Sequence, residues 1–117
     1  MKRVASVIGL PPENREEYER YHAAVWPGVL AAIEAAGIRN YSIFRHGDLL
    51  FSYFEYVGDD YEGDMARMAE DPTTREWWAV QEPLQRQLPG TPDGEWWMPI
   101  DEVFHHDGGS ADPAGRP

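Results

Sequence analysis

Two side chains that can move a proton lie close together in the segment from Glu17 to Pro27. Tyr18 and His22 are four residues apart, so an α-helix places both side chains on one face. The unperturbed pKa of histidine, about 6.5, lets its ring donate or accept a proton near neutral pH. A phenol one turn away can hydrogen-bond a polyol or the imidazole itself. This helix face predicts acid–base chemistry, although a single histidine does not identify the reaction.

Three more aromatic side chains could surround this pair. Tyr41 lies on a predicted strand, and Trp77 and Trp78 are adjacent on a predicted helix. Neighbouring helix residues point about 100° apart, so one indole can pack in the core while the other lines a cleft. A flat indole face suits the C–H face of a sugar ring, and the indole N–H can donate to a hydroxyl. Ordinary hydrophobic packing is the alternative for both tryptophans.

The remaining histidines do not suggest a metal site. His46 falls in a predicted hairpin turn, and the adjacent His105 and His106 would point to opposite faces of a strand. No His-x-x-x-His or carboxylate–histidine cluster occurs at helical spacing. We therefore expect no metal and no cofactor. Glu55 and Glu102 are alternative general bases, although carboxylates on strands are more commonly solvated or paired.

Charge and composition exclude several classes of partner. The chain has 117 residues, a formal net charge of −11 and no cysteine. Nucleic acids and anionic membranes bind clusters of Lys and Arg, so the charge argues against both. The lack of cysteine excludes disulfides and thiolate metal sites. No stretch approaches the ~20 apolar residues of a membrane helix, and the first apolar run is too short for a signal peptide. We expect a soluble protein in the cytoplasm.

Hydrophobic periodicity and turn residues predict six helices and strands. Asn14 can cap the first helix and Gly37 marks its end, while Pro27 should kink the helix between them. Asp71 and Pro72 should break the second helical region by capping a new helix. The predicted elements are a strand over 3–10, a kinked helix over 13–36, strands over 38–45 and 49–57, a broken helix over 60–87, and a strand over 95–105.

The element order β-α-β-β-α-β is that of a ferredoxin-like α+β fold. We expect one domain over residues 1–106, followed by a disordered tail rich in Gly and Pro over 107–117. Helices cover only one face of such a sheet, so a second copy of the chain should cover the other face. This predicts a homodimer, as a dimeric α/β barrel. The two-residue period of a strand predicts that odd-numbered residues from Arg39 to Arg45, with Tyr41 among them, share one face.

The chain resembles the L-rhamnose mutarotase family over about residues 1–107. No single motif is specific, but their combination and order are. The motifs are Tyr18…His22…Val25-Trp26-Pro27, Gly37-Ile38-x-Asn40-Tyr41-Ser42-Ile43, Leu50-Phe51, Glu55, Trp77-Trp78 and Met98…Glu102-Val103-Phe104-His105. In that family the fold is a homodimeric ferredoxin-like barrel, and the enzyme interconverts the α and β anomers of L-rhamnose.

The resemblance implies roles for five residues. The proton-transferring histidine of the family falls on His22, and its sugar-binding residues fall on Tyr18, Tyr41, Trp77 and Trp78. Mutarotation needs one proton taken from the anomeric hydroxyl and one given to the ring oxygen. A positioned acid or base supplies about 10²–10⁴-fold, which one histidine can provide without a cofactor. A second proton carrier, either water or a tyrosine, is also needed, and the sequence does not identify it.

Two other functions fit the same residues. A cofactor-free monooxygenase of the dimeric α/β barrel type would hold a polycyclic substrate in an aromatic pocket and would consume oxygen. A non-catalytic sugar- or metabolite-binding domain would bind its ligand without accelerating anomerisation. Haem binding, with His22 or His105 as the axial ligand, is a further alternative. The doubled Trp96-Trp97, the His105-His106 pair and the tail depart from the family pattern, and the exact sugar is left open.

Overall fold

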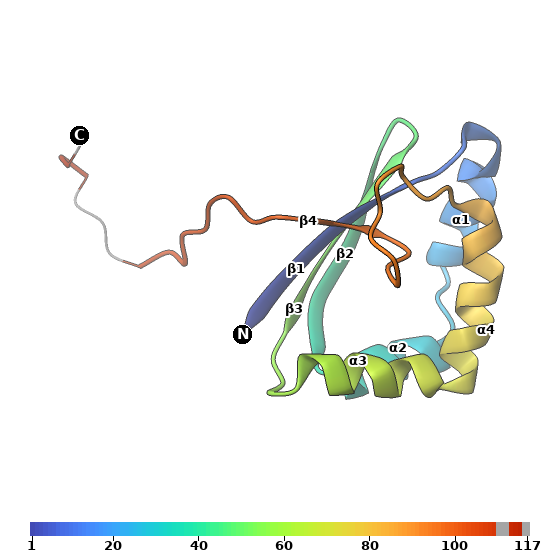
Figure 1. Cartoon of the computed structure of the whole chain (residues 1–117), viewed down its shortest axis with the longest axis horizontal. Coiled ribbons are helices and arrows are strands. Elements are labelled where there is room, and N and C mark those ends of the chain that lie inside the picture. The colour runs from blue at the N-terminus through green and yellow to red at the C-terminus, as the bar shows by residue number, and fades with distance from the viewer. Residues whose placement is uncertain (110–112, 116–117) are drawn as a thin grey trace.

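The computed structural model describes residues 1–109 and 113–115. Antiparallel strands form one sheet in the order β2-β3-β1-β4, and the helices lie on one face of that sheet (Figure 1). This arrangement confirms the predicted ferredoxin-like topology. The strands are β1 (Lys2–Gly9), β2 (Ile38–His46), β3 (Leu49–Tyr56) and β4 (Met98–Ile100). The helices are α1 (Arg15–His22), α2 (Pro27–Ala35), α3 (Tyr61–Glu70) and α4 (Pro72–Gln81), with 3-10 turns η1 (Pro12–Asn14) and η2 (Glu82–Leu84).

The predicted helix over 13–36 is wrong in one respect, because the structure divides it into α1 and α2. Trp26 is extended, with φ −60° and ψ 133°, as expected for a residue that precedes proline. Pro27 then begins α2. The first N–H groups of a helix have no acceptor within the helix, so a proline without an N–H loses no hydrogen bond at this position. Asn14 precedes α1, but its side chain does not cap the helix. Its Nδ2 donates instead to the carbonyl of Leu84 at 2.9 Å, which ties the start of α1 to the end of the second helical region.

The second helical region breaks at Asp71, as predicted. The carboxylate of Asp71 accepts hydrogen bonds from the backbone N–H and the hydroxyl of Thr74, each at 2.9 Å, and Pro72 is the first residue of α4. The α-helix ends at Gln81 and continues only as η2. The predicted end at residue 87 is therefore too late, because Pro83 has no N–H with which to continue the helical hydrogen bonds.

The last strand is much shorter than the predicted strand over 95–105. Of this run, only Met98–Ile100 pairs with β1. Beyond these residues the contact continues through side chains, with Arg3 Nε donating to Glu102 at 2.7 Å. Val103 and Phe104 are 96% and 80% exposed. The sheet of one chain therefore gives these two apolar side chains no cover.

A β-bulge in β2 decides which side chains share a face. Arg39 pairs with Glu55, and the next paired residue of β2 is Ser42, so one extra residue is accommodated between them. Asn40 has a φ of +51°, a left-handed conformation that asparagine tolerates better than most residues. The bulge places Arg39 on the opposite face of the sheet from Tyr41. The prediction that these two residues share a face is therefore wrong.

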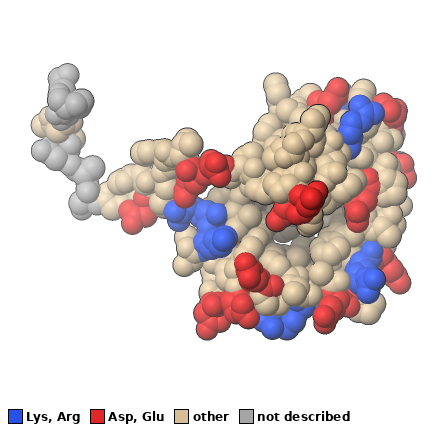
Figure 2. Space-filling view, viewed as in Figure 1, with Lys and Arg blue, Asp and Glu red and all other residues tan. Residues whose placement is uncertain are grey.

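The core lies between the helices and the sheet. Fully buried aliphatic side chains from β1, the following loop and β3 form its centre, and Tyr18 of α1 packs on them. The buried cluster is Ile8, Leu10, Tyr18, Leu50 and Leu84, with Tyr21, Ile43, Trp96 and Trp97 packed against it. In the space-filling view the surface is hollowed between the sheet and the helices, with acidic side chains nearby (Figure 2). Small-molecule sites in α+β domains often occupy such concave regions.

The other face of the sheet is free of helices (Figure 1). By register it carries Phe51 and Tyr53 of β3, with Phe44 and Ile100 beside them on the neighbouring strands. Phe44 is 63% exposed and Ile100 41% exposed. This free face is apolar and aromatic at its centre, as the homodimer prediction requires.

Two further predictions concern membrane-spanning helices and the C-terminal tail. None of the described helices has the length and apolar character needed to cross a membrane. The predicted disordered tail over 107–117 lies partly outside the described residues. Its described residues, 107–109 and 113–115, form neither helix nor strand, and their disorder stays a prediction.

Candidate active site

Tyr18 and His22 meet on one face of α1, as their spacing predicts. Their rings stack with centroids 4.1 Å apart and an interplanar angle of 24°. His22 Nδ1 lies 2.8 Å from the backbone carbonyl of Tyr18. A carbonyl only accepts hydrogen bonds, so Nδ1 carries the hydrogen and donates it. The lone pair of the neutral ring therefore sits on Nε2, which has no hydrogen-bond partner among the described residues.

Burial tunes His22 toward its neutral form. The ring is half-buried, and this desolvation lowers the pKa of His22, while the hydrogen bond to the Tyr18 carbonyl opposes the shift. A pKa below the ordinary value of about 6.5 leaves the imidazole uncharged at neutral pH. His22 is thus held in one tautomer and in the protonation state of a base.

Trp77 fixes the imidazole from the side of α4. The Trp77 indole meets the His22 ring edge-on, with centroids 5.2 Å apart, and it makes similar contacts with Tyr21 and Trp26 at 6.0 and 5.1 Å. Trp77 is only 6% exposed, whereas Trp78 is 37% exposed. The two adjacent indoles thus diverge, with one packed against the histidine and the other partly open to solvent.

The two predicted sugar-binding tyrosines come from different elements, Tyr18 from α1 and Tyr41 from β2, and of the two only Tyr18 is among the described residues that line the cavity beside His22. Tyr41 projects from β2 toward the helices and packs on Phe54 at 5.4 Å between ring centroids. Burial of its hydroxyl raises the pKa of Tyr41 to about 12, although part of the ring is exposed. Burial also raises the pKa of Tyr18, and the nearby Tyr41 raises it further. Both phenols therefore stay protonated at neutral pH and can donate hydrogen bonds.

A cavity of about 310 Å³ opens beside His22. Its size falls within the range of about 300–1,000 Å³ that is usual for small-molecule sites. One wall comes from α1 and the other from the β2–β3 hairpin. The lining residues are Tyr18, Glu19, His22, Ala23, Ile43, Phe44, Arg45 and Leu50.

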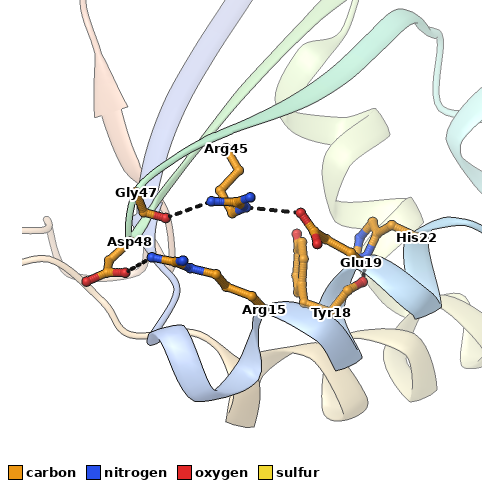
Figure 3. Close-up of polar contacts among 7 residues, drawn as sticks. All are labelled: Arg15, Tyr18, Glu19, His22, Arg45, Gly47 and Asp48. Carbon is orange, nitrogen blue, oxygen red and sulfur yellow. Dashed lines mark hydrogen bonds and ion pairs between the residues drawn. The ribbon is translucent and has the colours of Figure 1, made fainter.

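An ion pair borders this cavity, and sequence reasoning did not assign it a role. Arg45 Nε donates to the Glu19 carboxylate at 3.0 Å, and Arg45 Nη1 donates to the carbonyl of Gly47 at 3.3 Å (Figure 3). Figure 3 shows that Glu19 and Arg45 approach each other above the Tyr18 ring, while Arg15 and Asp48 form a separate pair at 2.5 Å. The signal was present in the sequence, because Glu19 precedes His22 by one turn and Arg45 shares the face of Tyr41.

A second group missed from the sequence supports the phenol of Tyr18. Trp96 Nε1 donates to Gln85 Oε1 at 2.7 Å, and the Gln85 side chain lies near enough to the Tyr18 hydroxyl to lower the pKa of that phenol, against the larger upward effect of burial. A neighbour lowers the pKa of a phenol by presenting a donor to its oxygen, so Gln85 turns its amide N–H toward Tyr18. The Tyr18 hydrogen is left available to a ligand. Trp96 of the doubled Trp96-Trp97 motif thus acts on Tyr18 indirectly, by holding the side chain of Gln85.

The alternative general bases lie elsewhere. Glu55 accepts from Asn40 at 2.7 Å and from Tyr53 at 2.8 Å, on the free face of the sheet. The pKa values of Glu55 and Glu102 are lowered, chiefly by hydrogen bonds from Asn40 and from Arg3. Paired carboxylates on the face away from His22 cannot serve the cavity described above. Among the described residues, no group of three or more His, Asp or Glu side chains is arranged to hold a metal ion.

The sequence matches the model of one protein family, L-rhamnose mutarotase, over residues 3–106. An L-rhamnose mutarotase of Listeria monocytogenes serotype 4b is 41% identical over 107 residues, which cover 90% of this chain and 98% of that protein. An L-fucose mutarotase of Xanthomonas campestris pv. campestris is 37% identical over 110 residues, covering 89% of this chain and 87% of that protein.

A solved structure supports the fold independently. The crystal structure of an L-rhamnose mutarotase from Formosa agariphila matches with a TM-score of 0.71 at 23% sequence identity. The match covers 92% of this chain and 100% of that one. The four-stranded sheet with helices on one face is therefore shared with an experimentally determined structure.

Proposed function

The chain belongs to the L-rhamnose mutarotase family, and from this we propose that it interconverts the α and β anomers of L-rhamnose or of a related 6-deoxyhexose. The activity is an isomerisation of a small neutral sugar. A relative named for L-fucose keeps a second sugar in the range of candidates. The observation that ties this activity to a site is the His22 ring, which lines the cavity as a neutral base with Nε2 unpaired among the described residues.

We assign His22 as the proton shuttle. Nε2 takes the proton of the anomeric hydroxyl while the bond from C1 to the ring oxygen breaks, and the imidazolium returns that proton to the ring oxygen. The open-chain aldehyde rotates about C1–C2 and closes on its other face by the reverse transfers. Each cycle conserves protons and uses no cofactor. The lowered pKa of His22 supports this role, because the ring is uncharged before it accepts the proton.

We assign Tyr18, Tyr41, Trp77 and Trp78 to sugar binding. The two phenols have raised pKa values, so they are poor acids and act by donating hydrogen bonds to sugar hydroxyls. Trp78 is the more exposed indole and would offer its face to the ring. Trp77 would act mainly by holding His22 in place, since their rings are in contact.

The activity is tested by saturation-transfer NMR, which measures exchange between anomers directly. A panel of L-rhamnose, L-fucose, L-mannose and D-glucose identifies the preferred sugar. His22→Ala should reduce exchange to near the uncatalysed rate, whereas His46→Ala, which replaces an exposed histidine at the end of β2, should leave it unchanged. An unchanged rate in His22→Ala would refute the assignment. Quenching of tryptophan fluorescence by sugar without faster exchange would instead identify a binding domain.

We also propose that the protein is a homodimer joined through the free face of the sheet. The support is the exposed apolar surface around Phe44 and Ile100, which no helix covers. Ile100→Glu should shift the mass measured by analytical ultracentrifugation from dimer to monomer. The matched control is Leu30→Glu on α2, which is 53% exposed but lies on the helical side. A monomeric wild-type protein would contradict this proposal.

We infer further that one domain over residues 1–106 carries the activity and that it works in the cytoplasm. The family model ends at residue 106, which supports the boundary. Removal of residues 107–117 should leave anomer exchange and the melting temperature unchanged, and a loss of either would place the tail within the functional unit. Cell fractionation against marker enzymes tests the location.

A further inference from the structure

Gln81 is a buried amide without a protein partner. Its side chain is 4% exposed, and neither Nε2 nor Oε1 has a hydrogen-bond partner among the described residues. Buried amides are nearly always paired, because an unpaired one loses its hydrogen bonds to water without replacement. An amide of this kind indicates that something outside the chain supplies the missing hydrogen bonds.

Gln81 is the last residue of α4, the helix whose Trp77 packs against His22, although no residue of α4 is among those that line the cavity. Gln81 follows Trp77 by four residues and Trp78 by three, so it shares a helix face with both. Helices α1 and α4 lie side by side (Figure 1). Trp77 contacts His22 toward one end of this pair, and Leu84 accepts from Asn14 at the other.

These two contacts show that α1 and α4 run in opposite directions, so that Gln81 lies level with the middle of α1. Tyr18 occupies that middle position. Four residues after Gln81, beyond η2, the Gln85 side chain faces the hydroxyl of Tyr18. Along the chain, Gln81 therefore lies between Trp77, whose ring contacts that of His22, and Gln85, whose side chain faces the phenol of Tyr18.

We propose that Gln81 binds a hydroxyl group of the sugar within the mutarotase site. This inference rests on the proposed function and adds a specificity residue to it. A primary amide offers both an acceptor oxygen and two donor hydrogens, and a sugar hydroxyl both donates and accepts. An uncharged amide also suits a neutral substrate, because its burial costs far less than that of a carboxylate.

The contrast with Gln85 sharpens the assignment. The side-chain amide of Gln85 is engaged within the protein, because its oxygen accepts from Trp96 and its amide N–H faces Tyr18. By contrast, neither Nε2 nor Oε1 of Gln81 has a hydrogen-bond partner among the described residues. Gln85 thus supports Tyr18, which lines the cavity, whereas the amide of Gln81 is available to a ligand.

Gln81→Met tests the proposal, because methionine has a similar length and no polar amide. The melting temperature without sugar should rise by about 2–5 °C, since an unpaired buried amide is removed. The dissociation constant for L-rhamnose, followed by tryptophan fluorescence, should increase about tenfold for one lost hydrogen bond. Gln81→Leu provides a second apolar variant in case methionine packs poorly. Unchanged sugar affinity in these variants, or a lower melting temperature with unchanged affinity, would overturn the proposal and assign the amide to a structural water.

Deoxy analogues of L-rhamnose separate a direct contact from a general change in shape. One monodeoxy sugar should bind the wild-type protein more weakly and yet lose nothing further in Gln81→Met, because the hydroxyl and the amide form one interaction. Additive losses for every monodeoxy sugar would exclude direct contact. Gln87→Met is the matched control, since Gln87 is exposed and its amide donates to the carbonyl of Glu95, its one hydrogen-bond partner among the described residues; its sugar affinity should equal that of the wild type.

The proposed function and this proposal fail in different ways. If the wild-type protein does not accelerate anomer exchange of any sugar in the panel, the mutarotase assignment fails whatever Gln81 does. If the wild type accelerates exchange and Gln81→Met retains the wild-type affinity and deoxy-sugar profile, only the role of Gln81 fails.

Discussion

The two adjacent tryptophans of α4 should respond to mutation in opposite ways. Trp77 is 6% exposed and makes edge-on contacts with Tyr21, His22 and Trp26. Each such aromatic contact is worth about 0.5–1.5 kcal/mol beyond the burial of area, and replacing a buried tryptophan by alanine costs about 3–5 kcal/mol in total. We expect Trp77→Ala to lower the free energy of unfolding by about that amount, which is a large part of the stability of a small domain.

Trp78→Ala should instead leave the fold nearly intact. Trp78 is 37% exposed and makes no ring contact among the described residues, so its loss should cost about 1 kcal/mol or less. If its face binds the sugar, the lost contact of about 1–1.5 kcal/mol raises KM by about tenfold.

Urea unfolding followed by circular dichroism measures the two stabilities, and NMR anomer exchange measures KM. The milder Trp77→Phe keeps an aromatic ring beside His22 and should retain a folded protein with reduced kcat. Equal destabilisation by Trp77→Ala and Trp78→Ala would refute this division of roles. So would a Trp78→Ala variant with an unchanged KM.

Two other predictions concern protonation and charge. The rate of anomer exchange should be constant above about pH 6.5 and fall as pH drops through the lowered pKa of His22. The folded state also loses stability in that window, because the unfolded chain binds the proton more readily. A rate of exchange that rises toward low pH, measured by NMR, would contradict the role of His22 as a base. Arg45→Met should change the free energy of unfolding by less than about 1 kcal/mol, since its pair with Glu19 is partly exposed, but should raise KM about tenfold or more as a charged donor leaves the cavity. Arg15→Met, which breaks the separate pair with Asp48, is its control for KM.

Much of the site could be predicted from local spacing, because α1 is a regular helix. Tyr18 and His22 needed only the four-residue helical repeat, and the break at Asp71 needed only a capping residue before a proline. The tautomer of His22 was beyond sequence reasoning, since it depends on one hydrogen bond to a backbone carbonyl. The role of Gln85 likewise depends on the path of the loop that carries Trp96 back to α4.

The errors in the fold came from features that tertiary contacts decide. Asn14 has the right chemistry for a cap, but the approach of η2 gives it a better partner in the carbonyl of Leu84. The run from residue 95 to 105 has strand-forming residues, yet β1 offers pairing only to Met98–Ile100. Pro27 was recognised as a disruption, and only its position at the start of α2 was missed.

Because of the bulge, deletion of Asn40 should disturb the site less than its replacement by a β-branched residue. With Asn40 in its left-handed conformation, Tyr41 and Arg45 face the helices although Arg39 faces the other way. If the residue were removed, plain alternation would keep every one of these side chains on its present face. If it were replaced by Val, which resists a positive φ at a cost of about 1–2 kcal/mol, the strand would tend to straighten and turn Tyr41 out of the site. A gap at this position in a relative would therefore preserve the site, whereas a β-branched residue there would threaten it.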